Sequence, residues 1–429
     1  MGSLLSELPA DSAKYSALEI FQKINSGELT SESVVRDCLD RIKAHDQFLH
    51  AWAFIDAELA LEQARACDMA TEPKGPLHGI PIGVKDVLDT ADMPTEYGSE
   101  IYAGYCPKED SACVAALRKA GAVILGKTTT TEFASPIPVG VRNPIDTTRT
   151  PGVSSSGSAA AVADFMVPIA NGTQTGGSVI LPAAFCGVVG YKASLNGLDR
   201  SGIAGLKETL DTLGYFSRSV HDIAIVYEAL TANKVPKDNS PITVGLCLTP
   251  MWSMADKCAQ QVLLEAASKL SNAGYNVEDV KLPSEFDSIE ESFRIISNFE
   301  GKQALAAEFE HHMEKMNSWM QMTGKSDWDS DDYNGALASA NSARRALNRL
   351  YEEYPIFLTL STSGEAPSDL VNASVSSFNR MWTLMHGPSI SLPVGEGPNG
   401  MPLGIQLVAR EGADGELIGH ARNIHEILG

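Results

Sequence analysis

Two short loops rich in glycine and serine most constrain the fold and the kind of site that this chain can form, because both contain residues that let a backbone approach a ligand closely. The first spans Gly152–Ser158 and the second spans Gly172–Ser178. Glycine permits close approach, and serine supplies a hydroxyl that can act as a nucleophile or pass on a proton. The segment between them, 159–168, is apolar and favours a helix, unlike a flexible linker. The two loops therefore indicate a site that stabilises a developing oxyanion.

Alternating helical and strand-like segments predict an α/β fold. Residues 15–70 have helical spacing, and Ile80–Val84 alternate as in a short strand with Lys85 at its end. Later strand-like segments follow a mostly helical region, and we expect them to complete the same sheet. We therefore expect one large domain over residues 1–429, with a mixed central β-sheet covered by helices. Its expected parts are N-terminal helices at about 1–70, a core at about 75–230, a variable helical region at about 250–350 and C-terminal strands at about 351–429.

The composition excludes some classes of partner. The chain has 33 Lys and Arg against 54 Asp and Glu, a net charge of −21, which repels nucleic acid and anionic membranes. Its 7 cysteines form no C-x-x-C pair, which favours free thiols in a reducing compartment. With no signal peptide or membrane-spanning run in the sequence, we expect a cytoplasmic protein that is a monomer or a homodimer.

Residues Gly121–Thr128 match the P-loop expression letter for letter. A P-loop follows a strand and opens a helix, whereas here a helical segment comes first and residues 122–125 read as a buried strand. We therefore expect Lys127 to end a strand near a site. A nucleotide-binding protein is the alternative from another class, and calorimetry with ATP tests it.

Serine and lysine are the residue types left for catalysis. The 9 histidines form no recognisable metal set, so we expect no metal site, and no serine lies in G-x-S-x-G. A serine hydroxyl needs a base, and lysine serves only if burial lowers its pKa from about 10.4. Lys85 ends an apolar strand, where desolvation is possible. An ion pair with Asp86 or another acid is the equally supported alternative.

Three segments together resemble the amidase signature family: Gly79–Asp86, Pro151–Ser158 and Gly172–Ser178. The resemblance runs nearly from end to end of the chain. It implies that Ser178 is the nucleophile, that Ser154 is a bridging serine held on a cis peptide bond, and that Lys85 is the base. The implied reaction is acyl transfer without metal or organic cofactor.

The resemblance also implies roles around these three residues. The backbone amides of Thr175, Gly176, Gly177 and Ser178 correspond to the family's oxyanion hole. Ser155 and Gln174 lie behind it. A substrate-side loop corresponds to the segment that includes Phe133, Ala134 and Ser135.

The chain departs from the family pattern at three positions behind the expected nucleophile. The family usually has an acid at position 174 and an arginine at 180 or 181, where this chain has Gln174, Ile180 and Leu181. Losing both members of an ion pair leaves no unpaired buried charge, so we interpret the change as a neutral replacement.

The Gln174 variant looks similar to a branch described as urethanases, which cleave carbamates. The expected substrate is thus a small-molecule amide or carbamate. The alternatives are a general aliphatic or aryl amidase, an inactive binding scaffold with this fold, and one chain of a multi-chain transamidase that acts on glutamine.

Overall fold

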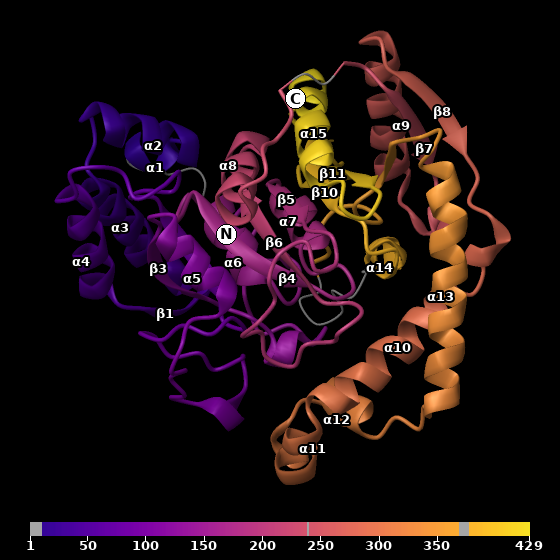
Figure 1. Cartoon of the computed structure of the whole chain (residues 1–429), viewed down its shortest axis with the longest axis horizontal. Helices are drawn as coiled ribbons and strands as arrows, with labels where there is room; N and C mark the ends of the chain where they lie inside the picture. Colours follow the sequence, from indigo (N-terminus) through magenta and orange to yellow (C-terminus); the bar gives the residue numbers. More distant parts are fainter. Residues whose placement is uncertain (1–10, 238–239, 369–376) are drawn as a thin grey trace.

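A single mixed sheet of eleven strands runs through the chain in the computed structural model, which describes residues 11–237, 240–368 and 377–429 (Figure 1). The strand order is β1-β3-β2-β4-β6-β5-β10-β11-β9-β7-β8. The strands are β1 (Trp52–Ile55), β2 (Pro81–Lys85), β3 (Val123–Thr128), β4 (Ile169–Gln174), β5 (Val189–Lys192), β6 (Thr212–Ser217), β7 (Thr243–Cys247), β8 (Asn276–Val280), β9 (Ile356–Leu360), β10 (Ser389–Glu396) and β11 (Pro402–Ala409).

Strands from the end of the chain lie in the middle of this sheet. β10 pairs antiparallel with both β5 and β11, and β11 pairs antiparallel with β9. β2 instead pairs parallel with β3 and β4, and β7 pairs parallel with β8 and β9. The late strands thus join the two ends of the sheet, which confirms the predicted single domain with a mixed central sheet.

Helices cover this sheet, and four of them, α10 to α13, form an arm beside it (Figure 1). The helices are α1 (Asp11–Lys14), α2 (Ala17–Ser26), α3 (Ser31–Leu49), α4 (Ala57–Asp68), α5 (Ala112–Lys119), α6 (Ser156–Ala163), α7 (Ile180–Cys186), α8 (Val220–Thr231), α9 (Lys257–Asn272), α10 (Ile289–Ala304), α11 (Ala306–His312), α12 (Ser318–Gly324), α13 (Ser330–Leu350), α14 (Ser377–Leu384) and α15 (Asp414–Leu428).

The innermost elements are buried on every side, and they position the two glycine- and serine-rich loops. All residues of β2, β4 and α6 are buried, as expected for parallel strands with helices on both faces. Gly172 on β4 faces a crowded neighbour, because an added Cβ would lie 2.7 Å from Phe216 Cε2 and 2.9 Å from Ser155 Oγ. Only glycine at position 172 lets the first loop lie this close to the strand that leads into the second.

Three predicted segments differ from the structure. Residues 15–70 were predicted to be helical, but Trp52–Ile55 form β1, which pairs antiparallel with β3. β8 lies within a region predicted to be mostly helical. It is the last strand at one edge of the sheet, and none of its residues is fully buried. The acidic run Asp327–Asp332 predicts a solvated loop, but α13 begins at Ser330, within this run. The Asp329 side chain accepts hydrogen bonds from the backbone N–H groups of Asp331 and Asp332, which caps the helix start.

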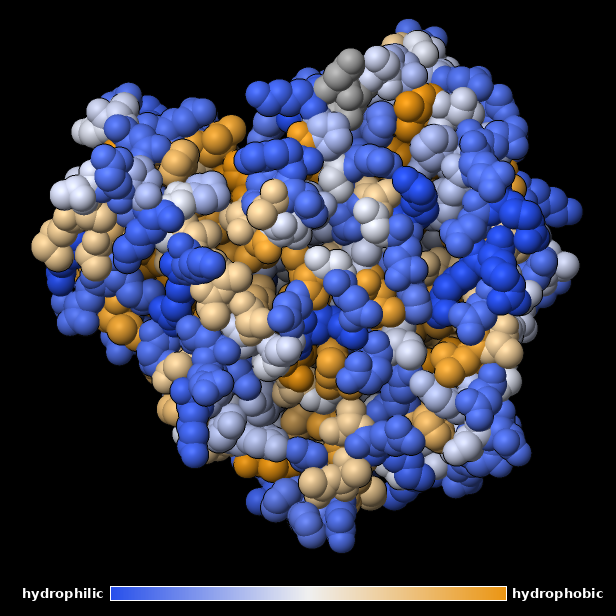
Figure 2. Space-filling model, viewed as in Figure 1, coloured by the Kyte–Doolittle hydropathy of each residue, from blue (hydrophilic) through white to orange (hydrophobic). Residues whose placement is uncertain are grey.

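Hydrophilic residues cover most of the face drawn in Figure 2, and hydrophobic residues lie between them in small groups. Among the described residues, no helix is both long enough and apolar enough to cross a bilayer. The cysteines at all seven positions are free thiols in this structure.

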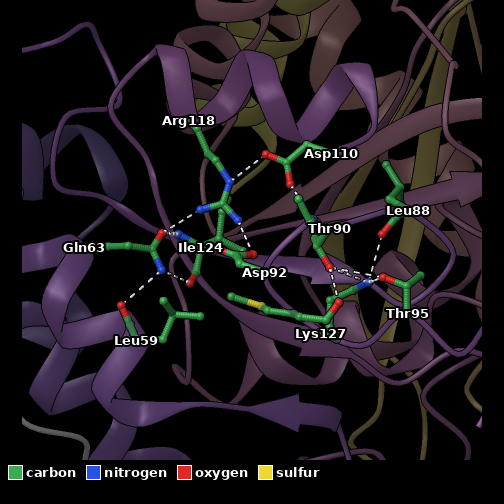
Figure 3. A network of polar contacts seen from close by, with 12 residues as sticks. Leu59, Gln63, Leu88, Thr90, Asp92, Thr95, Asp110, Arg118, Ile124 and Lys127 are labelled. Atoms are coloured by element: carbon green, nitrogen blue, oxygen red, sulfur yellow. Dashed lines mark hydrogen bonds and ion pairs between the residues drawn. The ribbon is translucent and has the colours of Figure 1, made fainter. Parts of the chain in front are cut away.

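The segment that matches the P-loop expression forms a buried strand end. Lys127 lies on β3, after the helix α5, and its Nζ pairs with Asp86 at 3.2 Å. The same ammonium group donates hydrogen bonds to the Leu88 carbonyl at 2.9 Å and to Thr95 Oγ1 at 2.5 Å (Figure 3). Because Lys127 is fully buried and bound to protein groups, this segment lacks the open glycine loop before a helix that a P-loop requires.

Candidate active site

Lys85 lies at the end of β2 and is fully buried. Its Nζ lies 2.9 Å from Ser154 Oγ and 2.8 Å from Thr173 Oγ1. Its backbone N–H donates to Asn171 Oδ1 at 2.7 Å, which fixes the strand end. Burial lowers the pKa of Lys85 to about 7, against a smaller opposing effect of Asp211. A lysine in this state can hold or release a proton near neutral pH.

The neighbouring acid does not neutralise Lys85. Asp86 pairs with Lys127 instead, and within the described ranges no ion pair joins Lys85 to a carboxylate. The ion-pair alternative left open by the sequence is therefore wrong for Asp86. Lys85 is held by hydroxyl groups, which is the environment that keeps a buried amine neutral.

Ser154 and Ser155 tie the first loop to the strand that carries the second. Ser154 is fully buried and reaches Lys85. Ser155 Oγ donates to the Thr173 carbonyl at 3.2 Å and accepts from the Thr173 N–H at 3.4 Å. The expected cis peptide bond at Ser154 is wrong for this structure, since every peptide bond in the described part of the chain is trans. A trans bond is favoured by about 3–4 kcal/mol at residues other than proline.

Ser178 lies in the turn between β4 and α7 and is partly exposed to a cavity. Its hydroxyl makes no hydrogen bond to any described residue, Ser154 included. The backbone N–H groups of Thr175, Gly176, Gly177 and Ser178 donate to no described protein group either. The turn thus places a hydroxyl and four unused amide donors at the surface of one cavity.

Gln174 holds this turn in place. Its Oε1 accepts from the backbone N–H groups of Val179 at 3.0 Å and Ile180 at 3.1 Å, and its Nε2 donates to Thr383 Oγ1 at 3.0 Å. All the polar atoms of the side chain are used without any charge. Ile180 is fully buried, and Leu181 packs in an apolar cluster. These contacts support a neutral replacement of the family's usual acid and arginine.

We expect Leu181→Arg to destabilise the protein and to bring no gain in activity. Leu181 packs in an apolar cluster with Phe185, Ala366 and Met401, and an unpaired buried guanidinium costs several kcal/mol, on the order of 3–5. Thermal denaturation and kcat/KM of the variant measure both effects. A gain in activity above about tenfold at unchanged melting temperature would show that position 181 requires the arginine.

The cavity beside Ser178 has a volume of about 750 Å³, including its open mouth. Phe133, Ala134 and Ser135, which the resemblance implies to be part of a substrate-side loop, form part of its wall. The opposite wall comes from α10, α12 and α14, and its side chains include Phe293, Ser297, Asn298, Trp319, Met320, Thr323 and Arg380. Glu132, next to Phe133, connects the two walls through a hydrogen bond. Its carboxylate accepts from the N–H of Asn317, the residue before α12, at 2.7 Å, and also from Ser99 Oγ at 2.9 Å.

Two contacts of this site were not predicted from the sequence. Thr173 holds Lys85, and Asp211 accepts a short hydrogen bond from Thr175 Oγ1. Thr173 could have been found, because Asn171 and Thr173 are two residues apart on a strand and face the same side. Nothing local in the sequence relates Asp211 to Thr175. No group of three or more potential metal ligands occurs in the portion of the chain that the structure describes.

Comparison with known proteins gives related sequences over most of the chain. The family model described as "Amidase" matches residues 33–418. A glutamyl-tRNA(Gln) amidotransferase chain of Oleidesulfovibrio alaskensis is 31% identical over 94% of this chain and 95% of its own length. The corresponding amidotransferase chain of Acidothermus cellulolyticus is 43% identical over 54% of this chain. This second match spans about half, 48%, of the relative's own length.

Solved structures match the fold along its full length. A crystal structure of an amidase has a TM-score of 0.89 at 26% identity, covering 97% of this chain and 100% of the other. The peptide amidase of Stenotrophomonas maltophilia has a TM-score of 0.83 at 27% identity, covering 97% and 98%. The chain therefore belongs to the amidase family, also called the amidase signature family.

Proposed function

We propose that this enzyme hydrolyses the C–N bond of a small-molecule amide or carbamate through an acyl-enzyme on Ser178. Neutral Lys85 takes a proton from Ser154, and Ser154 takes one from Ser178 as Ser178 Oγ attacks the acyl carbon. The N–H groups of residues 175–178 stabilise the oxyanion. The proton returns through Ser154 to the leaving nitrogen, and the C–N bond breaks. Water then releases the acyl group from Ser178.

The observation that carries this proposal is the fully buried Lys85, with a pKa of about 7, in contact with Ser154 Oγ. A base with a pKa near the working pH is the most effective proton acceptor. Because no hydrogen bond joins Ser154 and Ser178 in this structure, the mechanism requires the two hydroxyls to move into contact when substrate binds. Catalytic hydrogen bonds often tighten in this way in the substrate complex.

The proposed substrate class includes carbamates. This part of the proposal is supported by the similarity of the Gln174 segment to urethanases. Cleavage of the C–N bond of an alkyl N-arylcarbamate would release an arylamine and leave an alkoxycarbonyl group on Ser178. Hydrolysis of that group gives an alcohol and carbon dioxide. The cavity beside Ser178 has both apolar and polar wall residues, among them Phe293, Trp319 and Asn298, as is usual for sites that bind small molecules.

A panel of p-nitroanilides, primary amides, esters and aryl carbamates, compared by kcat/KM, tests the substrate class. We expect turnover of at least one anilide or carbamate by the purified chain alone, with release of the amine. Carbamate turnover at or above that of the matched amide supports the urethanase assignment. Turnover of amides without carbamates contradicts that assignment and favours a general amidase.

A role as one chain of a transamidase is the second candidate, because the curated relatives are components of amidotransferases. The same panel separates the two candidates when glutamine is included among its primary amides. A transamidase component would release ammonia from glutamine and would need its partner chains for product formation. An enzyme of the proposed class works alone on several amides, and glutamine is a poor substrate for it.

A further inference from the structure

We propose that the cavity beside Ser178 binds a substrate that carries a carboxylate, and that Lys207 and Arg380 bind this group. This inference rests on the proposed function, since it names the class of amide or carbamate that the site accepts. The carboxylate lies on a part of the substrate away from the scissile bond. A small monoamide of a dicarboxylic acid is the simplest compound of this class.

The charge of the cavity wall is opposite to that of the chain. Acidic residues outnumber basic ones by 54 to 33 in the whole sequence. The described cavity wall nevertheless contains two cationic side chains, Lys207 and Arg380, and no carboxylate. Since an acidic surface otherwise repels anions, a cationic wall inside the cavity selects for an anionic group there.

Lys207 presents a charge that the described protein does not neutralise. Its side chain is half-buried, and its ammonium group has no ion pair or hydrogen bond to any described residue. The side chain passes over Gly301 on α10, where an added Cβ would lie 3.0 Å from Lys207 Cε and 3.9 Å from Nζ. The absence of a side chain at Gly301 therefore makes room for the lysine at the cavity wall.

Asp211 connects Lys207 to the turn that carries Ser178. One carboxylate oxygen of Asp211 accepts from the Lys207 backbone N–H at 2.8 Å, and the other accepts from Thr175 Oγ1. The Asp211 carboxylate thus binds the backbone N–H of Lys207 and makes no ion pair with the ammonium group of Lys207. The same contact keeps Lys207 in a constant position relative to the turn at residues 175–178.

Arg380 contributes further donors from α14. Its Nη1 pairs with Glu290 at 3.3 Å, and its guanidinium lies 5.7 Å from the centre of the Phe293 ring. The described structure shows no partner for its other N–H groups, which can bind a carboxylate. Because Glu290 already offsets much of its charge, Lys207 supplies the main attraction and Arg380 adds directed hydrogen bonds.

A matched pair of substrates tests this inference: N-(4-nitrophenyl)succinamate, which carries a carboxylate, and N-(4-nitrophenyl)-4-oxopentanamide, which replaces it with a neutral methyl ketone. We expect kcat/KM for the anion to exceed that for the neutral compound by about tenfold or more. Lys207→Met should lower this ratio by about tenfold, and Lys207→Arg should retain most of it. The control is Lys281→Met, an exposed lysine outside the cavity wall, which should leave the ratio unchanged.

Calorimetry with the same two compounds and the Ser178→Ala variant separates this inference from the proposed function. If neither compound is hydrolysed, the proposed function fails for these amides. The carboxylate site is still supported if Ser178→Ala binds the anion more tightly than the neutral compound and if the Ser178→Ala, Lys207→Met double variant loses this difference. Three results would overturn the carboxylate site. The first is a wild-type ratio of kcat/KM, anion to neutral compound, of one or less. The others are a ratio that neither Lys207→Met nor Arg380→Met changes, and equal or undetectable binding of both compounds.

Discussion

Ser178→Ala is expected to abolish turnover and to leave the fold intact. Removing the nucleophile of a serine hydrolase lowers kcat by about 10⁴-fold or more. The hydroxyl of Ser178 makes no hydrogen bond to the described protein and faces the cavity. Its loss should therefore change the melting temperature little, as for other substitutions outside the core. The measurements are kcat on the best substrate of the panel and thermal denaturation of both proteins.

Ser158, a serine with a structural role, provides the control for Ser178→Ala. Ser158 is the last residue of the first loop and already lies on α6, and its Oγ lies 2.7 Å from Thr128 Oγ1 in the core. Ser158→Ala removes a buried hydrogen bond, which costs about 1 kcal/mol, and should retain turnover to within about tenfold. If Ser178→Ala keeps activity within about tenfold of wild type, Ser178 is not the nucleophile.

Lys85→Met is expected to cause the second largest loss of activity, about 10²- to 10⁴-fold in kcat, the usual contribution of a general base. Methionine fits the same buried space without an amine, so the fold should persist. Lys85→Arg should be equally inactive, because a guanidinium stays protonated at every accessible pH.

The pH profile shows whether Lys85 acts as the base. Burial lowers the pKa of Lys85 to about 7, and only the neutral amine accepts a proton. Activity should therefore be low below this pKa, rise with pH through a midpoint near 7 and level off above it. In Lys85→Met this rise should disappear from kcat/KM, and the residual activity should increase only as hydroxide becomes abundant.

Lys192 is the matched control for this measurement. It is fully buried, burial lowers its pKa to about 8, and its Nζ donates to the carbonyls of Ala193 at 2.8 Å and Gly387 at 2.5 Å. It contacts neither Ser154 nor Thr173. Lys192→Met should lower the melting temperature and leave the midpoint of the pH profile near 7. An unchanged profile in a stable Lys85→Met variant contradicts the role of Lys85.

The parts of this fold that depend on local sequence could be predicted. Alternation located β2 with Lys85 at its end. In the apolar segment 159–168 the helix was predicted only in part, because α6 ends at Ala163. β8 could not be predicted in this way. Its residues are largely exposed at the edge of the sheet and pair only with β7, so the strand depends on tertiary pairing and has no apolar pattern of its own.

The site was predictable only where motifs or family resemblance applied. Lys85 and Ser154 lie 69 positions apart, and no spacing rule brings them together. The unused amides of the turn at 175–178 are consistent with the expected oxyanion hole, whose role the enzyme assays test. The cavity wall is different, since Lys207, Gly301 and Arg380 come from three separate segments. Their proximity follows from how the α10 to α13 arm packs beside the sheet, which a single sequence does not encode locally.

Labelling with a fluorophosphonate probe, followed by peptide mapping by mass spectrometry, tests the central claim most directly. The probe forms a covalent bond only with an activated serine hydroxyl. Folded wild-type protein should carry one adduct, on Ser178, and Lys85→Met should react far more slowly because its serine lacks a base. No adduct on folded protein, or an adduct on Ser154 in place of Ser178, would contradict the acyl-enzyme mechanism.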